Sequence, residues 1–103
     1  MTAMRYDAED RRLVCAPEGR MDAMRSSVLQ EDVERELKTH ADAHGLGLEL
    51  DLAAVTFASS SFLRTCITLA KAVGAERFSI TGSSPAIKKI FVETGVDRHF
   101  KVS

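Results

Sequence analysis

Three consecutive serines, Ser59, Ser60 and Ser61, are the residues whose type and spacing could do chemistry in this sequence. They follow an apolar stretch typical of a strand and open an amphipathic stretch typical of a helix. A helix start offers unpaired backbone N–H groups and a partial positive charge. The serines could therefore cap the helix, or Ser60 could carry a phosphate that pairs with Arg64 one turn later.

Other patterns for catalysis or metal binding have little support. His40 and His44 are four residues apart with Glu36 in line, a spacing that can place ligands on one helix face, but no cysteine or histidine clusters beside them and His99 is remote. The sequence has no Gly-x-Ser-x-Gly elbow and no Walker-type phosphate loop. We therefore expect no metal, no cofactor and no enzymatic activity.

Composition narrows the class of protein. The 103 residues fit a single domain spanning residues 1–103, and 45% hydrophobic and 28% charged residues are ordinary for a globular protein. Fourteen basic and fifteen acidic side chains leave a net charge of −1, so no overall field recruits nucleic acid. We expect no direct binding of nucleic acid.

Location can also be predicted. The amino terminus lacks the apolar segment of a secretory signal, and no charge-free apolar run reaches the ~18 residues of a membrane-spanning helix. Cys15 and Cys66 form neither a Cys-x-x-Cys pair nor a disulfide framework, and both lie in apolar surroundings. We expect two buried free thiols in a cytoplasmic protein with no membrane insertion.

The elements before the serines are a hairpin and a long helix. The hairpin pairs residues 4–6 with residues 13–16. We expect the helix to start at Ser26 or Ser27, or a turn earlier at Asp22, and to end at His44 before Gly45. Its apolar stripe consists of Leu29, Val33, Leu37, Ala41 and His44.

The strand before the serines covers residues 48–52, with Val55 and Phe57 as its exit. The serine-led helix ends at Gly74, a strand follows at residues 78–80, and Ser84-Pro85 starts a helix that ends at Gly95. A last short strand covers residues 100–102. The expected buried stripe of the serine-led helix is Phe62, Leu63, Cys66, Ile67, Ala70 and Val73.

The resulting order, ββαβαβαβ, predicts an α/β fold. We expect a small, mostly parallel or mixed sheet of about four to five strands with helices packed against it. The serines at 59–61 and at 83–84 follow successive strands, so they should open on the same edge of the sheet. Ligands and partners of such sheets meet that edge, and helix starts there could hold a nucleotide or a phosphorylated metabolite.

Several motifs carry a family resemblance. They are Glu18-Gly19-Arg20-Met21-Asp22, Asp51-Leu52, the run from Val55 to Leu63, Gly82-Ser83-Ser84-Pro85 and the run from Ile90 to Val96. On these residues the chain resembles the STAS family, the bacterial anti-sigma factor antagonists and their relatives, over nearly its whole length. Members of that family carry Asp-Ser-Ser/Thr-Gly-Leu at the corresponding helix start.

The resemblance implies a regulatory role in transcription. In the family, a partner anti-sigma factor acting as a kinase phosphorylates the serine after the motif Asp, and the unphosphorylated form binds that partner. Ser60 takes the acceptor position here, with Ser59 and Ser61 as alternatives, and Asp22 matches the acidic residue before the first helix. The motif Asp is replaced by Ser59 and the motif Gly by Phe62. These departures fit either a divergent partner or a binding surface that has lost the switch.

We therefore expect a regulatory phosphoprotein that binds an anti-sigma factor or serine kinase through residues 59–64, with Phe62 as an apolar anchor. A homodimer is compatible with the sequence. Two alternatives remain: a non-switching accessory subunit of a membrane lipid-transport ATPase complex, and a sensor that binds a small ligand or nucleotide. The predicted partner-binding residues are Asp22, Ser59, Ser60, Ser61, Phe62, Arg64, Ser83 and Ser84.

Overall fold

Five strands form the main sheet of the computed structural model, which describes residues 3–40 and 45–103. The spatial order is β1-β2-β4-β6-β7, in which β1 and β2 pair antiparallel and all other neighbours pair parallel. This confirms the predicted α/β class and the mostly parallel sheet. The strands are β1 (Ala3–Asp7), β2 (Arg12–Ala16), β4 (Gly47–Asp51), β6 (Phe78–Thr81) and β7 (Lys101–Val102).

Two short strands outside this sheet correct the predicted order. β3 (Gly19–Met21) and β5 (Val55–Ala58) pair parallel as a separate two-stranded sheet. The predicted order had no strand at residues 19–21 and treated Val55 and Phe57 as the exit of the preceding strand. Segments of three or four residues are too short to show the alternation by which a strand is recognised in a sequence. Their pairing partners are also remote in the chain.

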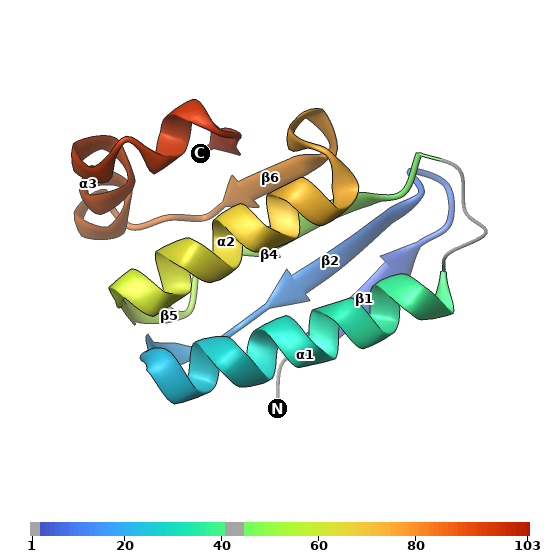
Figure 1. Ribbon diagram of the computed structural model, residues 1–103, viewed down its shortest axis with the longest axis horizontal. Coiled ribbons are helices and arrows are strands. Elements are labelled where there is room, and N and C mark those ends of the chain that lie inside the picture. The colour runs from blue at the N-terminus through green and yellow to red at the C-terminus, as the bar shows by residue number, and fades with distance from the viewer. Residues whose placement is uncertain (1–2, 41–44) are drawn as a thin grey trace.

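Three helices pack on these strands: α1 (Ala23–Thr39), α2 (Ser60–Val73) and α3 (Pro85–Thr94). Short 3-10 turns follow α2 and α3, at η1 (Ala75–Arg77) and η2 (Val96–Arg98). Figure 1 shows α1 and α2 side by side over one face of the main sheet, with α3 beyond the end of β6. No helix in the described part of the chain is long and apolar enough to cross a membrane.

The core lies between the main sheet and the helices. Alternate residues of the inner strands point into it, including Leu13, Leu48, Leu50 and Ile80, as the two-residue period of a strand requires. On the opposite face, the carboxylate of Glu49 accepts hydrogen bonds from Arg12 Nη1 and Thr81 Oγ1, both at 2.9 Å. These bonds link β2, β4 and β6 in register.

Aromatic contacts attach the carboxyl-terminal segment to this core. The Phe100 ring meets the Phe78 ring edge to face at 4.7 Å and the Phe91 ring at 6.4 Å between centroids. Edge-to-face aromatic pairs contribute about 0.5–1.5 kcal/mol beyond their buried area. Phe100 therefore holds the turn after α3 against β6 and brings β7 into the sheet.

The boundaries of α1 differ from the prediction. Asp22 is its N-cap, and Ser26 and Ser27 lie inside the helix, so the earlier of the two predicted starts is the correct one. The helix ends at Thr39 instead of His44, and the ring of the capping residue His40 stacks on Tyr6 with centroids 4.0 Å apart. Ala41 and His44, which the prediction placed on the apolar stripe, lie outside the described residues.

Both cysteines are buried free thiols, as predicted. Burial, with smaller contributions from the carboxylates of Glu36 and Asp32, raises the pKa of Cys15 to about 12. Burial also raises the pKa of Cys66. Because the thiolate is the reactive form, both side chains are inert packing groups near neutral pH.

Gly82, before α3, and Gly95, after it, offer a matched test of the close approach between Gly82 and Asp51. Both have left-handed backbones, with φ of +69° and +75°, but a Cβ on Gly82 would lie 2.7 Å from Asp51 Oδ1 and one on Gly95 would meet nothing within 4 Å. We expect Gly95→Ala to lower the free energy of unfolding by about 1 kcal/mol and Gly82→Ala by about 2 kcal/mol or more. Urea denaturation of both variants checks this, and equal losses would contradict the close approach.

Candidate functional site

Ser59 joins the start of α2 to the start of α1. It is the N-cap of α2, and its hydroxyl oxygen accepts a hydrogen bond from the Phe62 N–H at 3.2 Å. The same hydroxyl donates to the carbonyl oxygen of Met21 at 2.8 Å, and the Ser59 N–H donates to that oxygen at 3.0 Å. The Ser59 hydroxyl is therefore fully engaged in holding the fold.

Ser60 is the accessible serine of the three. It is the first residue of α2 and is exposed, whereas Ser61 is half-buried and turns toward α1. Within residues 3–40 and 45–103, the Ser60 hydroxyl makes no hydrogen bond. A phosphate placed there would sit at the positive end of the α2 dipole, with the exposed Arg64 one turn away.

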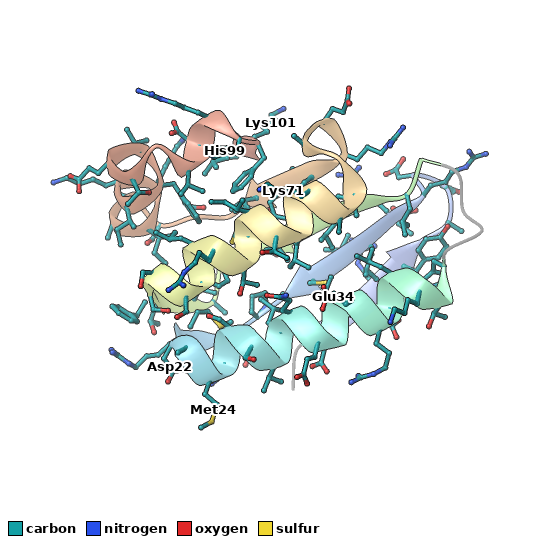
Figure 2. All side chains as sticks on the ribbon, viewed as in Figure 1. Asp22, Met24, Glu34, Lys71, His99 and Lys101 are labelled. Carbon is teal, nitrogen blue, oxygen red and sulfur yellow. The ribbon has the colours of Figure 1, made fainter. Side chains whose placement is uncertain are left out.

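Asp22 lies next to this serine cluster, because the carbonyl oxygen of its neighbour Met21 accepts the hydrogen bonds from the hydroxyl and the N–H of Ser59. Its carboxylate caps α1 by accepting the Arg25 N–H at 2.9 Å, and the Arg25 guanidinium donates to the Glu18 carbonyl at 2.7 Å. Figure 2 shows Asp22 at the start of α1, where Met24 points away from the protein. The structure thus brings the predicted residue Asp22 and the serines to one edge.

Phe62 is not available to a partner. Its side chain is 0% exposed and belongs to the hydrophobic core, as the predicted buried stripe of α2 requires. The prediction that Phe62 anchors an interface is wrong, because the third helical residue of α2 faces the sheet. The Phe that replaces the family's Gly therefore adds no bulk to the accessible surface.

Ser83 and Ser84 begin α3 at the edge that the parallel strands β4 and β6 share (Figure 1). Ser84 is the N-cap and accepts the Ile87 N–H at 3.3 Å, while the Ser83 N–H donates to the Ser103 carbonyl at 3.2 Å. The starts of α2 and α3 lie at the same end of the molecule (Figure 1), but Ser59–Ser61 follow β5 of the two-stranded sheet and Ser83–Ser84 follow β6 of the main sheet, so the two serine turns do not follow successive strands of one sheet as predicted. The groove that Ser61 lines, however, lies between α1 and α2, and neither Ser83 nor Ser84 lines it.

The sequence did not predict that two apolar side chains, Phe57 on β5 and Met24 at the start of α1, are exposed. Phe57 is 38% exposed, and the guanidinium carbon of Arg20 lies 4.4 Å above its ring centre. No sequence signal relates these two residues, because the β3–β5 pairing brings them together. Met24 is 76% exposed on α1 with Val28 one turn on, and their spacing of four residues on a polar helix face was a readable signal.

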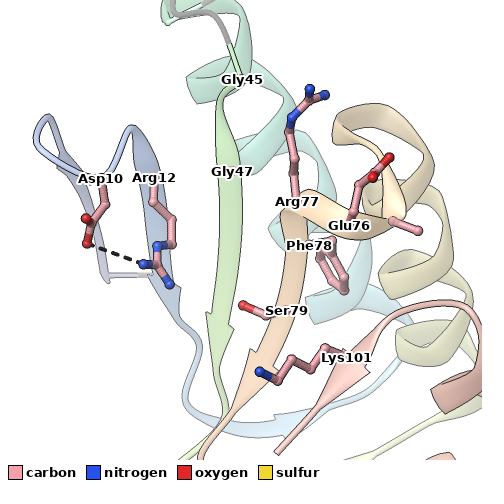
Figure 3. A pocket seen from close by; sticks show the side chains of 10 residues that line it. Asp10, Arg12, Gly45, Gly47, Glu76, Arg77, Phe78, Ser79 and Lys101 are labelled. Carbon is pink, nitrogen blue, oxygen red and sulfur yellow. Dashed lines mark hydrogen bonds and ion pairs between the residues drawn. The ribbon is translucent and has the colours of Figure 1, made fainter.

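Another cavity lies at the opposite end of the sheet, where β2, β4, β6 and β7 begin (Figure 3). It has a volume of about 540 Å³. Cations and carboxylates mix on its walls, and Arg12 is already paired with Asp10 at 3.3 Å. Parallel sheets bind ligands at their carboxyl ends, so this cavity is not the candidate site.

No group of three or more metal-binding side chains occurs among residues 3–40 and 45–103. His40 stacks on Tyr6, and His44 lies outside the described residues.

The candidate site is the edge formed by the starts of α1 and α2 and by the β3–β5 pair, because this edge brings together Asp22, Ser59 and Ser60.

The chain is similar to known proteins in family and in fold. A family model described as "Mlab, STAS domain" matches residues 4–102. A comparison with curated proteins found no match.

Solved structures share the fold over almost the whole chain. An anti-sigma factor antagonist from Mycobacterium paratuberculosis has a TM-score of 0.78 at 23% identity, covering 99% of this chain and 85% of that one. A serine-to-glutamate variant of RsbS from Moorella thermoacetica has a TM-score of 0.72 at 24% identity, with the same coverage of 99% and 85%. The protein TM1081 has a TM-score of 0.79 at 16% identity, covering 100% and 80%. At these identities the likeness establishes the fold alone.

The different roles of Ser59 and Ser60 can be separated by stability. We expect Ser59→Ala to lower the free energy of unfolding by about 1–2 kcal/mol, because α2 loses its cap and Met21 loses a hydrogen bond. Ser60→Ala should stay within about 0.5 kcal/mol of the native chain, since the exposed hydroxyl makes no bond. Chemical denaturation of the two variants measures both values, and a larger loss in Ser60→Ala would contradict these roles.

Proposed function

The chain belongs to the STAS domain family, and we propose that it is a regulatory module that binds an anti-sigma factor with serine kinase activity. The proposed contact edge comprises the starts of α1 and α2 and the β3–β5 pair. Ser60 is the proposed phosphate acceptor in this arrangement. The observation that supports it most strongly is the exposed, unbonded hydroxyl of Ser60 at the amino end of α2.

Phosphorylation at Ser60 is compatible with the fold. A phosphoserine adds roughly −1.5 to −2 charges at neutral pH, and a helix amino terminus stabilises negative charge. Ser59 supplies the cap, so modification of Ser60 breaks no hydrogen bond. The change would act on the surface potential of the edge, which a bound partner would sense as repulsion or as a lost contact.

Two exposed apolar side chains are the proposed main contacts of this edge with the partner. Phe57 on β5 and Met24 in the first turn of α1 are both exposed and replace Phe62 as the proposed anchors. Aromatic side chains and Met are enriched at protein interfaces, as is Arg, which Arg20 contributes over the Phe57 ring. Asp22, Ser60 and Arg64 would form the polar rim.

A second candidate is a non-switching accessory subunit of a membrane lipid-transport ATPase complex. Ser59 in place of the motif Asp supports it, because this edge lacks the carboxylate that accompanies the family's phosphorylated serine. The name Mlab in the description of the matching family model is a further reason to keep this candidate. Neighbouring genes for sigma-factor regulators favour the first function, and transporter genes favour the second.

A kinase assay tests the switch. With the native partner and ATP, we expect intact-mass spectrometry to show one added phosphate on the native chain and on Ser61→Ala. Ser60→Ala should gain none, because the accessible acceptor is absent. Ser84→Ala is the matched control, since Ser84 is also exposed at a helix start. Phosphate on Ser60→Ala, or none on the native chain, would refute the switch.

Capture of the partner tests the contact edge separately. We expect Phe57→Ala and Met24→Ala each to weaken partner binding about tenfold or more, because each removes an exposed apolar anchor. Val92→Ala removes a comparable exposed side chain from α3 and should bind normally. Surface plasmon resonance with the purified partner gives the affinities. Equal affinities of all three variants would exclude this edge as the interface.

A further inference from the structure

A polar groove runs between α1 and α2 beside the serine cluster. Its volume is about 270 Å³. Hydroxyl and amide side chains dominate its walls, with Ser26, Ser27 and Gln30 from α1 facing Ser61 and Thr65 from α2. Arg64 is the one charged side chain among the lining residues, and none of them is acidic. Such walls present hydrogen-bond donors and a positive charge.

The hydroxyl of Ser26 has no partner in this groove. Ser26 is 1% exposed, and among the residues that the structure describes its buried oxygen has no hydrogen-bond partner. A buried hydroxyl without a partner destabilises a protein, and native structures satisfy nearly all such groups. A polar group held in the groove would provide the missing partner.

The local field favours a negative charge as that group. The groove passes the first turn of α2, where the positive end of that helix dipole favours a negative charge, whereas the carboxylate of Asp22 offsets the dipole at the start of α1. Thr65 Oγ1 donates to Gln30 Oε1 at 3.3 Å, which leaves the two amide N–H donors of Gln30 unused. Arg64 at the rim adds a full positive charge and a fork of donors suited to an oxyanion.

We propose that the α1–α2 groove binds a phosphate group. A phosphate offers several acceptor oxygens, which match the hydroxyls, the Gln30 amide and the Arg64 guanidinium. At about 270 Å³ the groove has room for one phosphate group. This site uses residues other than Ser60 and does not depend on the partner proposed above.

Titration of the whole chain with inorganic phosphate tests the site. At constant ionic strength, with chloride as the reference anion, we expect saturable amide NMR shifts along residues 23–30 and 60–68. Arg64→Gln should weaken the affinity about tenfold, because it removes the charged donor. Arg98→Gln is the matched control, since Arg98 is an exposed arginine on η2 outside the groove, and it should bind as the native chain does.

Ser26→Ala separates a ligand role from a structural one. The hydroxyl makes no bond in the free protein, so its removal should leave the stability unchanged or higher while the phosphate affinity falls. A loss of stability with unchanged affinity would overturn the proposal. Shifts that fail to saturate at tens of millimolar phosphate, that chloride reproduces, or that saturate at the same phosphate concentration in Arg64→Gln would also overturn it.

A second titration identifies the source of the phosphate group. O-phosphoserine that binds more tightly than inorganic phosphate would support the site and assign it to a phosphate ester. Equal or weaker binding of O-phosphoserine, with saturable binding of inorganic phosphate, would support the site and assign it to the free anion. Absence of binding by both compounds would refute it.

Discussion

The carbonyl oxygen of Met21 is the point on which the functional edge depends. It accepts the N–H of Ser59 at 3.0 Å and the hydroxyl of Ser59 at 2.8 Å, and it lies at the end of β3, one residue before the cap of α1. The starts of α1 and α2 are therefore fixed to each other by one peptide group. Together with the packing of α1 on α2 and the pairing of β3 with β5, these bonds position Ser60 and the groove between the helices.

The elements of the fold could be predicted from the sequence where they follow local patterns, but not where they depend on contacts such as this one between distant residues. The main sheet and three helices follow from local patterns: alternation in β4, the apolar stripe of α2 and the Ser84-Pro85 start of α3. The β3–β5 pair and the Met21–Ser59 bonds join residues more than thirty positions apart, and no local pattern encodes such pairing. Asp22 and Ser60 were therefore found by type and resemblance, whereas the Arg20–Phe57 contact and the groove needed the fold.

The two departures from the family motif look different once the fold is known. Ser and Asp are both strong N-caps, so Ser59 preserves the helix start and removes only a charge. Phe62 adds to the core beneath the sheet and leaves the outer surface unchanged. The departures therefore alter the electrostatics at the edge more than its shape. A phosphate on Ser60 would add the same charge as in a chain that keeps the motif Asp, but without the carboxylate at position 59 the phosphorylated edge would be about one unit less negative.

Arg64 connects the two proposals. A phosphate in the groove would engage its guanidinium from one side, and a phosphate on Ser60, one helical turn away, would engage it from the other. One planar guanidinium cannot neutralise two dianions, and the two negative groups repel each other at this range. The two events therefore oppose each other. A phosphate on Ser60 would therefore lower the affinity of the groove for a second phosphate group. The same pair of helix starts would then give the edge sensitivity to phosphate in its surroundings as well as to a kinase.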